Sequence, residues 1–113
     1  HLPQSAVSVG IYQGKNLASP MKNRQEIKGT LEEIFQKIWE YFRLRFKTKY
    51  EYNQGKRIEI LEYPEAAVRE MIVNALIHRN YSISGEQIRT FLFEDKFWVS
   101  SPGRLPNTIT LDN

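Results

Sequence analysis

Two segments of the chain repeat apolar residues at the spacing of an amphipathic α-helix. In residues 63–81 the repeated positions are Val68, Met71, Ile72, Ala75 and Leu76. Side chains three and four positions apart share one side of a helix, so this spacing predicts a helix with a buried face. Pro64 fits the first turn of this helix, because the N–H that proline lacks would have no helical partner there.

The other helical pattern covers residues 31–45 and begins with a capping signal. Thr30 and Glu33 have the spacing of a capping box, in which each side chain accepts a hydrogen bond from the other residue's backbone N–H. The apolar positions that follow are Leu31, Ile34, Phe35, Ile38 and Phe42. This pattern predicts a helix that packs on a sheet.

Elsewhere apolar and polar residues alternate, as they do in β-strands. We expect strands at residues 6–12, 25–28, 50–52, 57–61, 87–93 and 97–100, with loops at 13–23 and 101–107. The segments 50–63 and 87–100 each contain two strands and a short turn, which is typical of hairpins. The sequence therefore predicts an α+β fold, a two-layer α/β sandwich with a mostly antiparallel mixed sheet and two main helices.

Composition narrows the class of protein. The 113 residues suit a single domain, and no apolar run approaches the roughly 20 residues of a membrane span. There is no cysteine, which excludes disulfides and thiolate metal sites and makes a cytoplasmic location the expectation. The net charge of +3 is compatible with nucleic acid without requiring it. The chain starts at His1 rather than Met, so we expect a segment of a longer protein.

A polar line runs along the helix predicted at residues 63–81. Glu70, Asn74 and His78 are each four positions apart and therefore share one stripe. Val73 and Ile77 form a second apolar pair on another side, so we expect the polar line to lie between two buried faces.

This polar line has three interpretations. In a metal or nucleotide site, Glu70 would orient a water, Asn74 would offer an oxygen to Mg²⁺ and His78 would contact phosphate. Zinc is disfavoured, because the helix carries one histidine and no His-Glu-x-x-His pattern. In a structural role, the three side chains would hydrogen-bond the neighbouring loop.

Two further segments are candidates for binding. Ser101-Pro102-Gly103 follows a predicted strand, and such loops line ligand sites, although Pro-Gly also makes ordinary turns. The second segment is basic and contains Arg43, Arg45, Lys47 and Lys49. These cations would contact nucleic-acid phosphates, or would stabilise a helix C-terminus and a solvated surface.

The stretch from Glu62 to Ser82, the aromatic hairpin after it and Ser-Pro-Gly-Arg-Leu-Pro-Asn at 101–107 resemble a known family. They are similar to the RecG-related transcriptional regulators of bacteria and archaea, strongly over residues 59–113 and loosely over 1–58. The module concerned is known as the "ATP-dependent DNA helicase RecG C-terminal-related" domain. The resemblance implies that residues 1–12 are the tail of a Schlafen/AlbA-type domain and that 13–113 form a GHKL ATPase-like module. The helicase name is not literal, because the chain has no P-loop.

In GHKL ATPases such as gyrase and MutL, one helix carries a glutamate near the attacking water and an asparagine on Mg²⁺. By resemblance these positions fall on Glu70 and Asn74, with His78 one turn later. This implies a catalytic role for Glu70, a metal-binding role for Asn74, and ATP and Mg²⁺ as cofactors.

The resemblance also places the next GHKL motif, Asp-x-Gly-x-Gly, on the 101–107 loop. Ser101 and Gly103 would then contact the nucleotide together with Asn74 and His78. However, Ser101 replaces the adenine-binding aspartate and Leu105 replaces the second glycine.

These departures lead to two functional expectations. The first is a non-catalytic central module of a DNA-binding transcriptional regulator, which serves interdomain contact, dimerisation or ligand sensing. Its partners would be DNA, through the full-length protein, and a second copy in a homodimer, with no membrane contact. The alternative is a nucleotide-binding GHKL-type ATPase domain with Mg-ATP at the Glu70/Asn74 helix.

Overall fold

Five strands form the main sheet, in the order β2-β1-β5-β6-β7. The structure is a computed structural model that describes residues 5–79 and 87–110. The strands are β1 (Ser5–Tyr12), β2 (Met21–Gly29), β5 (Ile88–Leu92), β6 (Lys96–Ser100) and β7 (Asn107–Thr110). β1 and β5 are parallel and all the other neighbours are antiparallel, which confirms a mostly antiparallel mixed sheet.

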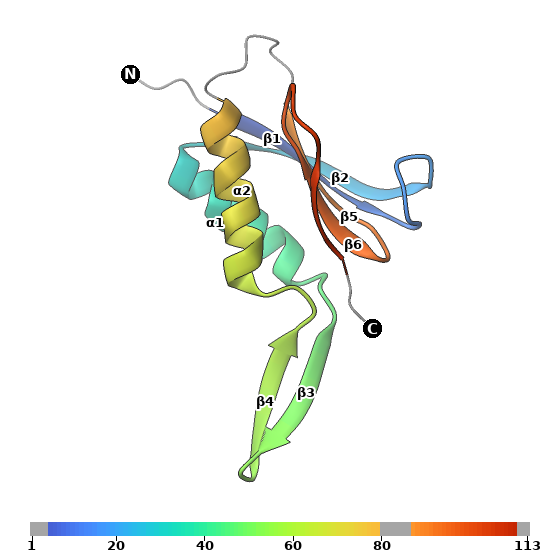
Figure 1. Ribbon diagram of the computed structural model, residues 1–113, viewed down its shortest axis with the longest axis vertical. Coiled ribbons are helices and arrows are strands. Elements are labelled where there is room, and N and C mark those ends of the chain that lie inside the picture. The colour runs from blue at the N-terminus through green and yellow to red at the C-terminus, as the bar shows by residue number, and fades with distance from the viewer. Residues whose placement is uncertain (1–4, 80–86, 111–113) are drawn as a thin grey trace.

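Two helices cover one face of this sheet, which confirms the two-layer sandwich (Figure 1). They are α1 (Leu31–Arg43) and α2 (Glu65–Arg79). The predicted capping box is present, because Glu33 N–H donates to the Thr30 hydroxyl and Thr30 N–H donates to the Glu33 carboxylate. Pro64 precedes α2, and its carbonyl accepts a hydrogen bond from Val68 N–H at 3.1 Å. Neither of these helices is long and apolar enough to cross a membrane.

The main core lies between the helices and the sheet. Val7 and Val9 of β1 point into it, as their alternation predicted, and Val68 and Ile72 of α2 pack from the other side. A second, smaller cluster lies on the opposite face of the sheet. It consists of Tyr12, Phe91, Phe93 and Trp98.

The predicted hairpin at residues 50–63 forms, but it is not part of the main sheet. β3 (Thr48–Asn53) and β4 (Lys56–Leu61) pair only with each other and project away from the sandwich (Figure 1). Gln54 and Gly55 have φ angles of 53° and 80°, as a tight two-residue hairpin turn requires. The hairpin stays apart because neither of its faces carries a continuous apolar stripe that could cover the core.

Two strands differ from the sequence predictions. β2 begins at Met21 rather than at residue 25, and β7 was not predicted at all. Both strands are polar and lie at the edges of the sheet. Their limits are set by pairing with the neighbouring strand more than by an alternation in their own sequence. β1 lies between β2 and β5, so residues 5–12 form an inner strand of this sheet.

Candidate functional site

The polar line of α2 lies on an exposed side of the helix. Glu70 and Asn74 are both exposed, while Val68, Ile72 and Ala75 are buried, as predicted. The backbone of His78 is helical, and its side chain lies outside the described part of the chain.

The expectation of a second buried face on α2 is wrong. Ile77 is 48% exposed and Val73 is only half-buried. The helix has two neighbours in the described structure, the sheet below it and α1 beside it. Val73 and Ile77 therefore border a shallow cavity of about 180 Å³ between the helices, together with Leu31 and Phe35.

The predicted loop after β6 begins with a tight turn. Arg104 N–H donates to the Ser101 carbonyl at 3.2 Å, and Gly103 has a φ of 75°. Proline and glycine at the two central positions, with a positive φ at the second, are the signature of a type II turn. A Cβ on Gly103 would meet no atom within 4 Å, so this glycine serves the backbone conformation and not a close approach.

One side of this turn faces α2 across a cavity of about 350 Å³, here called the Asn74 cavity. Its walls are Asn74, Ala75, Val99, Ser101, Arg104, Leu105 and Asn107. The structure thus brings together Asn74 and Ser101, two predicted site residues from separate elements. Glu70, one turn earlier on α2, is not among the described residues that line this cavity.

The other side of the turn borders a second cavity of about 550 Å³, here called the arginine cavity. It contains Arg24, Arg89 and Arg104, and Gly103 also lines it. Ser101 and Arg104 line both cavities, so the turn is a wall between them. Arg24 and Arg89 could not be predicted as neighbours, because nothing in the local sequence indicates that β2 and β5 lie on either side of β1.

The Asn74 cavity offers amide, hydroxyl and guanidinium groups to a ligand, with apolar contacts from Ala75, Val99 and Leu105. Its described lining contains no carboxylate. Within residues 5–79 and 87–110, no three His, Asp or Glu side chains are grouped to hold a metal ion. Because Mg²⁺ prefers carboxylate and other hard oxygen ligands, this lining suits a polar or anionic ligand better than a metal ion.

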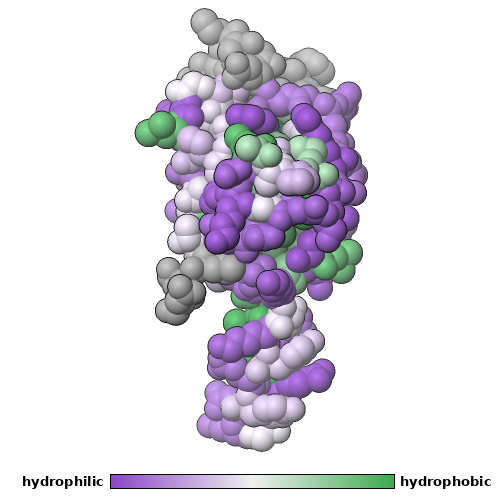
Figure 2. Space-filling model, turned by 90° about the vertical axis from the view of Figure 1, so that its right-hand side faces the viewer, coloured by the Kyte–Doolittle hydropathy of each residue, from purple (hydrophilic) through white to green (hydrophobic). Residues whose placement is uncertain are grey.

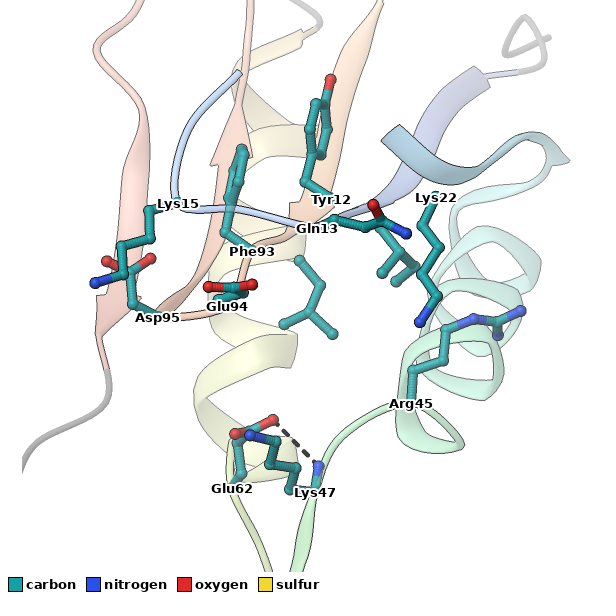
Figure 3. A pocket seen from close by; sticks show the side chains of 12 residues that line it. Tyr12, Gln13, Lys15, Lys22, Arg45, Lys47, Glu62, Phe93, Glu94 and Asp95 are labelled. Atoms are coloured by element: carbon teal, nitrogen blue, oxygen red, sulfur yellow. Dashed lines mark hydrogen bonds between the residues drawn. The ribbon is translucent and has the colours of Figure 1, made fainter. Parts of the chain in front are cut away.

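Another cavity, of about 760 Å³, lies beyond the end of α1 and is bordered by part of the predicted basic segment. Lys15, Lys22, Arg45 and Lys47 border it, but so do Glu62, Glu94 and Asp95 (Figure 3). Lys47 N–H donates to the Glu62 carboxylate at 3.1 Å. The mixed signs of charge make this cavity a poor match for a polyanion.

Several basic side chains of residues 43–49 make contacts within the chain. The Arg45 guanidinium donates to the Tyr41 carbonyl at 2.6 Å, and its Cζ lies 4.1 Å from the centroid of the Tyr41 ring. Lys49 forms an ion pair with Glu51 at 3.6 Å, and Arg43 lies in the last turn of α1. These contacts favour the structural interpretation of the segment, in which cations complement a helix C-terminus.

The fold has a counterpart among solved structures. No protein-family model matches the sequence, and no curated protein matches it either. A crystal structure of the DIP2311 protein from Corynebacterium diphtheriae resembles this chain with a TM-score of 0.72 and 24% sequence identity. The match covers 91% of this chain and 21% of that one, so the chain spans about a fifth of its neighbour's length. This likeness shows a shared fold.

Proposed function

We propose that this chain is a non-catalytic central module of a bacterial or archaeal DNA-binding transcriptional regulator, and that it senses a small polar ligand in the Asn74 cavity. The observation that carries the proposal is that α2 and the Ser101–Arg104 turn, on which the family resemblance rests, line one cavity. On this proposal the protein works in the cytoplasm, and the surface that reads DNA lies mostly in other parts of the full-length protein.

The position of Glu70 supports a role without catalysis. A general base must come within hydrogen-bond reach of the water that it activates. Glu70 is exposed and is not part of the described cavity lining, and Ser101 supplies a neutral hydroxyl where the ATPases have a carboxylate. The cavity volume of about 350 Å³ is near the lower limit for small-molecule sites.

The ligand-sensing proposal is tested with ATP and ADP as probes, each with and without Mg²⁺. A ligand at a hundred times its Kd stabilises a protein by about 2.7 kcal/mol, which a thermal unfolding curve resolves. We expect stabilisation that does not depend on Mg²⁺, that Asn74→Ala reduces, and that Arg43→Gln, a surface control, leaves unchanged. If millimolar nucleotide did not shift the unfolding temperature, nucleotides would be excluded as the sensed ligand. The ATPase alternative would then be excluded as well.

The ATPase alternative has its own test. Purified protein with Mg-ATP should release phosphate no faster than the buffer blank, and Glu70→Gln should change nothing. Release above the blank that disappears in Glu70→Gln would establish the enzyme and refute the non-catalytic role.

A second candidate function, dimerisation, is favoured by the β3–β4 hairpin. Tyr52 is 77% exposed, and Ile58 and Ile60 are also exposed. If β4 paired antiparallel with β4 of a second copy about Ile58, Arg57 of each chain would face Glu59 of the other. A two-fold contact needs this kind of self-complementary surface.

Dimerisation is tested by sedimentation equilibrium. Ile58→Lys would place two like charges at the two-fold axis and should weaken dimers about tenfold or more, which corresponds to about 1.4 kcal/mol. Ile77→Lys, at an exposed isoleucine on α2, is the matched control. A wild-type protein that stays monomeric at high micromolar concentration would exclude this candidate.

A further inference from the structure

The arginine cavity lies on the face of the main sheet that the helices leave open. Side chains alternate between the two faces of a strand, so Ser8 of β1, Arg24 of β2, Arg89 of β5 and Ser100 of β6 share the face opposite Val7 and Val9. Figure 2 views the molecule from this side and shows a largely hydrophilic surface.

The charged side chains that line the cavity are all positive in the described part of the chain. Three arginines line it, and its described lining contains no aspartate or glutamate. None of the three forms an ion pair with a carboxylate of the described residues. Arginine stays protonated at any physiological pH, so the cavity carries a formal charge of three positive units that its own walls do not compensate.

The carboxylate of Glu26, on the same face of β2, is held at the edge of the cavity by Gln87, which lines the cavity. It accepts a hydrogen bond from Gln87 at 2.5 Å and forms an ion pair with Lys28 at 3.3 Å. The Gln87 hydrogen bond, followed by Lys28, lowers the pKa of Glu26, and Arg24 adds a smaller effect. Glu26 therefore remains ionised but is held by its own partners.

Two of the guanidinium groups are held in place by neighbours. Arg24 Nε donates to the Ser8 hydroxyl at 3.1 Å, and among the described residues its terminal nitrogens have no hydrogen-bond partner. Arg89 Cζ lies 5.3 Å from the centroid of the Trp98 ring, and that ring stacks on Phe91 with an interplanar angle of 8°. Such preorganised donors lose less conformational entropy when they bind.

The strand between the two arginines presents small residues on this face, and the Phe91 ring packs close to one of them. β1 separates β2 from β5, so these two strands lie roughly 10 Å apart, and Arg24 is level with Gly10 whereas Arg89 is level with Ser8. On this face β1 presents Ser8 and Gly10, and a Cβ on Gly10 would lie 3.2 Å from the Phe91 ring and from the Asn23 carbonyl. Arg104 approaches from the turn after β6.

We propose that the arginine cavity is a binding site for a phosphate-bearing ligand, held by Arg24, Arg89 and Arg104. Guanidinium groups bind phosphate oxygens with paired N–H donors, which gives geometry as well as charge. The phosphates belong either to a free polyphosphorylated molecule or to a nucleic-acid backbone. The proposal does not rest on the ligand-sensing function, because Arg24 and Arg89 line this cavity and not the Asn74 cavity, although Arg104 borders both.

The proposal is tested by isothermal titration calorimetry with sodium tripolyphosphate in a chloride buffer. Loss of a charge-assisted contact should weaken binding about tenfold or more in Arg24→Gln and in Arg89→Gln. The matched control is Arg57→Gln in the β3–β4 hairpin, because Arg57 also stacks on an aromatic ring, with its Cζ 4.7 Å from the centroid of Tyr50. Equal weakening in all three variants, or no binding by the wild type, would overturn the proposal.

A measurement on the wild-type protein covers the case in which a variant fails to fold. In an amide NMR titration with tripolyphosphate, the shifted signals should include Arg24, Arg89 and Gly103 and should exclude the β3–β4 hairpin. Shifts spread over every basic segment would overturn the proposal.

A 20-base-pair DNA duplex then identifies the source of the phosphates. If the duplex displaces tripolyphosphate and its binding weakens in Arg89→Gln but not in Arg57→Gln, the site takes a nucleic-acid backbone. If tripolyphosphate binding persists in excess duplex, the site takes a free polyphosphorylated molecule.

Discussion

Tyr63, between β4 and α2, buries a hydroxyl without a partner. The side chain is 1% exposed, its ring lies 5.1 Å from that of Phe46, and its hydroxyl has no hydrogen-bond partner in the described structure. Burial raises the pKa of the Tyr63 phenol, and the carboxylates of Glu62 and Asp95 raise it further. Ionisation of this residue is therefore much easier in the unfolded chain than in the folded one.

This difference predicts alkaline sensitivity. In the unfolded chain Tyr63 loses its proton near pH 10, while the folded protein keeps it, so stability is complete below that pH and falls as the pH rises above it. Tyr63→Phe should flatten this decline and change stability at neutral pH by about 1 kcal/mol or less. Urea unfolding from about pH 8 to pH 11 measures the effect. If stability fell with pH equally steeply in Tyr63→Phe, the decline would not come from Tyr63.

Thr90 offers a second buried hydroxyl, on β5 between Val9 of β1 and Val99 of β6. Thr90 is fully buried, and its hydroxyl has no partner among the described residues. Thr90→Val removes this unpaired polar group and keeps the shape, so we expect stability to rise by about 1 kcal/mol. A thermal melt measures the change. Destabilisation would show that the hydroxyl is hydrogen-bonded in solution.

Among the elements, α1 follows most directly from its sequence, because its start is encoded locally. The Glu33 carboxylate accepts from Thr30 N–H at 2.8 Å, and this backbone hydrogen bond is the main cause that lowers the pKa of Glu33. Thr30→Ala should cost about 1 kcal/mol of stability. The contribution of Glu33 is present above its ordinary pKa of 4.5 and is lost as the pH falls below that value.

The contribution of Glu33 is measured by comparing the free energy of unfolding of the wild type and of Glu33→Gln between about pH 3 and pH 7. The wild type should lose more stability than the variant as the pH falls, and a constant difference between them would contradict the assignment. Glu32→Gln, at an exposed glutamate in the same turn, is the control.

The β3–β4 hairpin should contribute little to the stability of the sandwich. Because Tyr52 is mostly exposed, Tyr52→Ser should change the free energy of unfolding by about 0.5 kcal/mol or less. Phe42→Ala in the core, where the side chain is fully buried, should cost about 3–5 kcal/mol. Chemical unfolding of both variants makes the comparison. A large loss in Tyr52→Ser would mean that the hairpin packs on the sandwich in solution.

At the scale of the whole molecule, the sequence predicted what neighbouring residues determine. The capping box at Thr30, the alternation along residues 6–12 and the short turn between the strands at 50–52 and 57–61 are all short-range signals. Strand order is a long-range property, so neither the parallel pairing of β1 with β5 nor the separation of the hairpin could be predicted. The candidate site divides in the same way: Asn74 and Ser101 were predicted through motifs, whereas Arg24 and Arg89 meet only through the sheet.

The Ser101–Arg104 turn connects the two faces of the molecule, because it borders the Asn74 cavity on one side and the arginine cavity on the other. Its shape depends on the positive φ of Gly103. Replacement by alanine adds no steric clash, since open space surrounds the Cβ position, so its effect is conformational. A left-handed conformation costs a residue other than glycine about 1–2 kcal/mol.

Gly103→Ala should therefore weaken both tripolyphosphate binding and nucleotide stabilisation several-fold, whereas Asn74→Ala, at a residue that lines only the Asn74 cavity, should weaken only nucleotide stabilisation. Gly55→Ala is the matched control, because Gly55 also has a positive φ, of 80°, with no atom within 4 Å of its Cβ position. It imposes a similar conformational cost on the distant hairpin and should leave both ligands unaffected. Calorimetry and thermal unfolding of the three variants measure these effects. If Gly103→Ala weakened binding in only one of the two cavities, the turn would not link the two sites. The unaffected cavity would then bind its ligand through residues outside the turn.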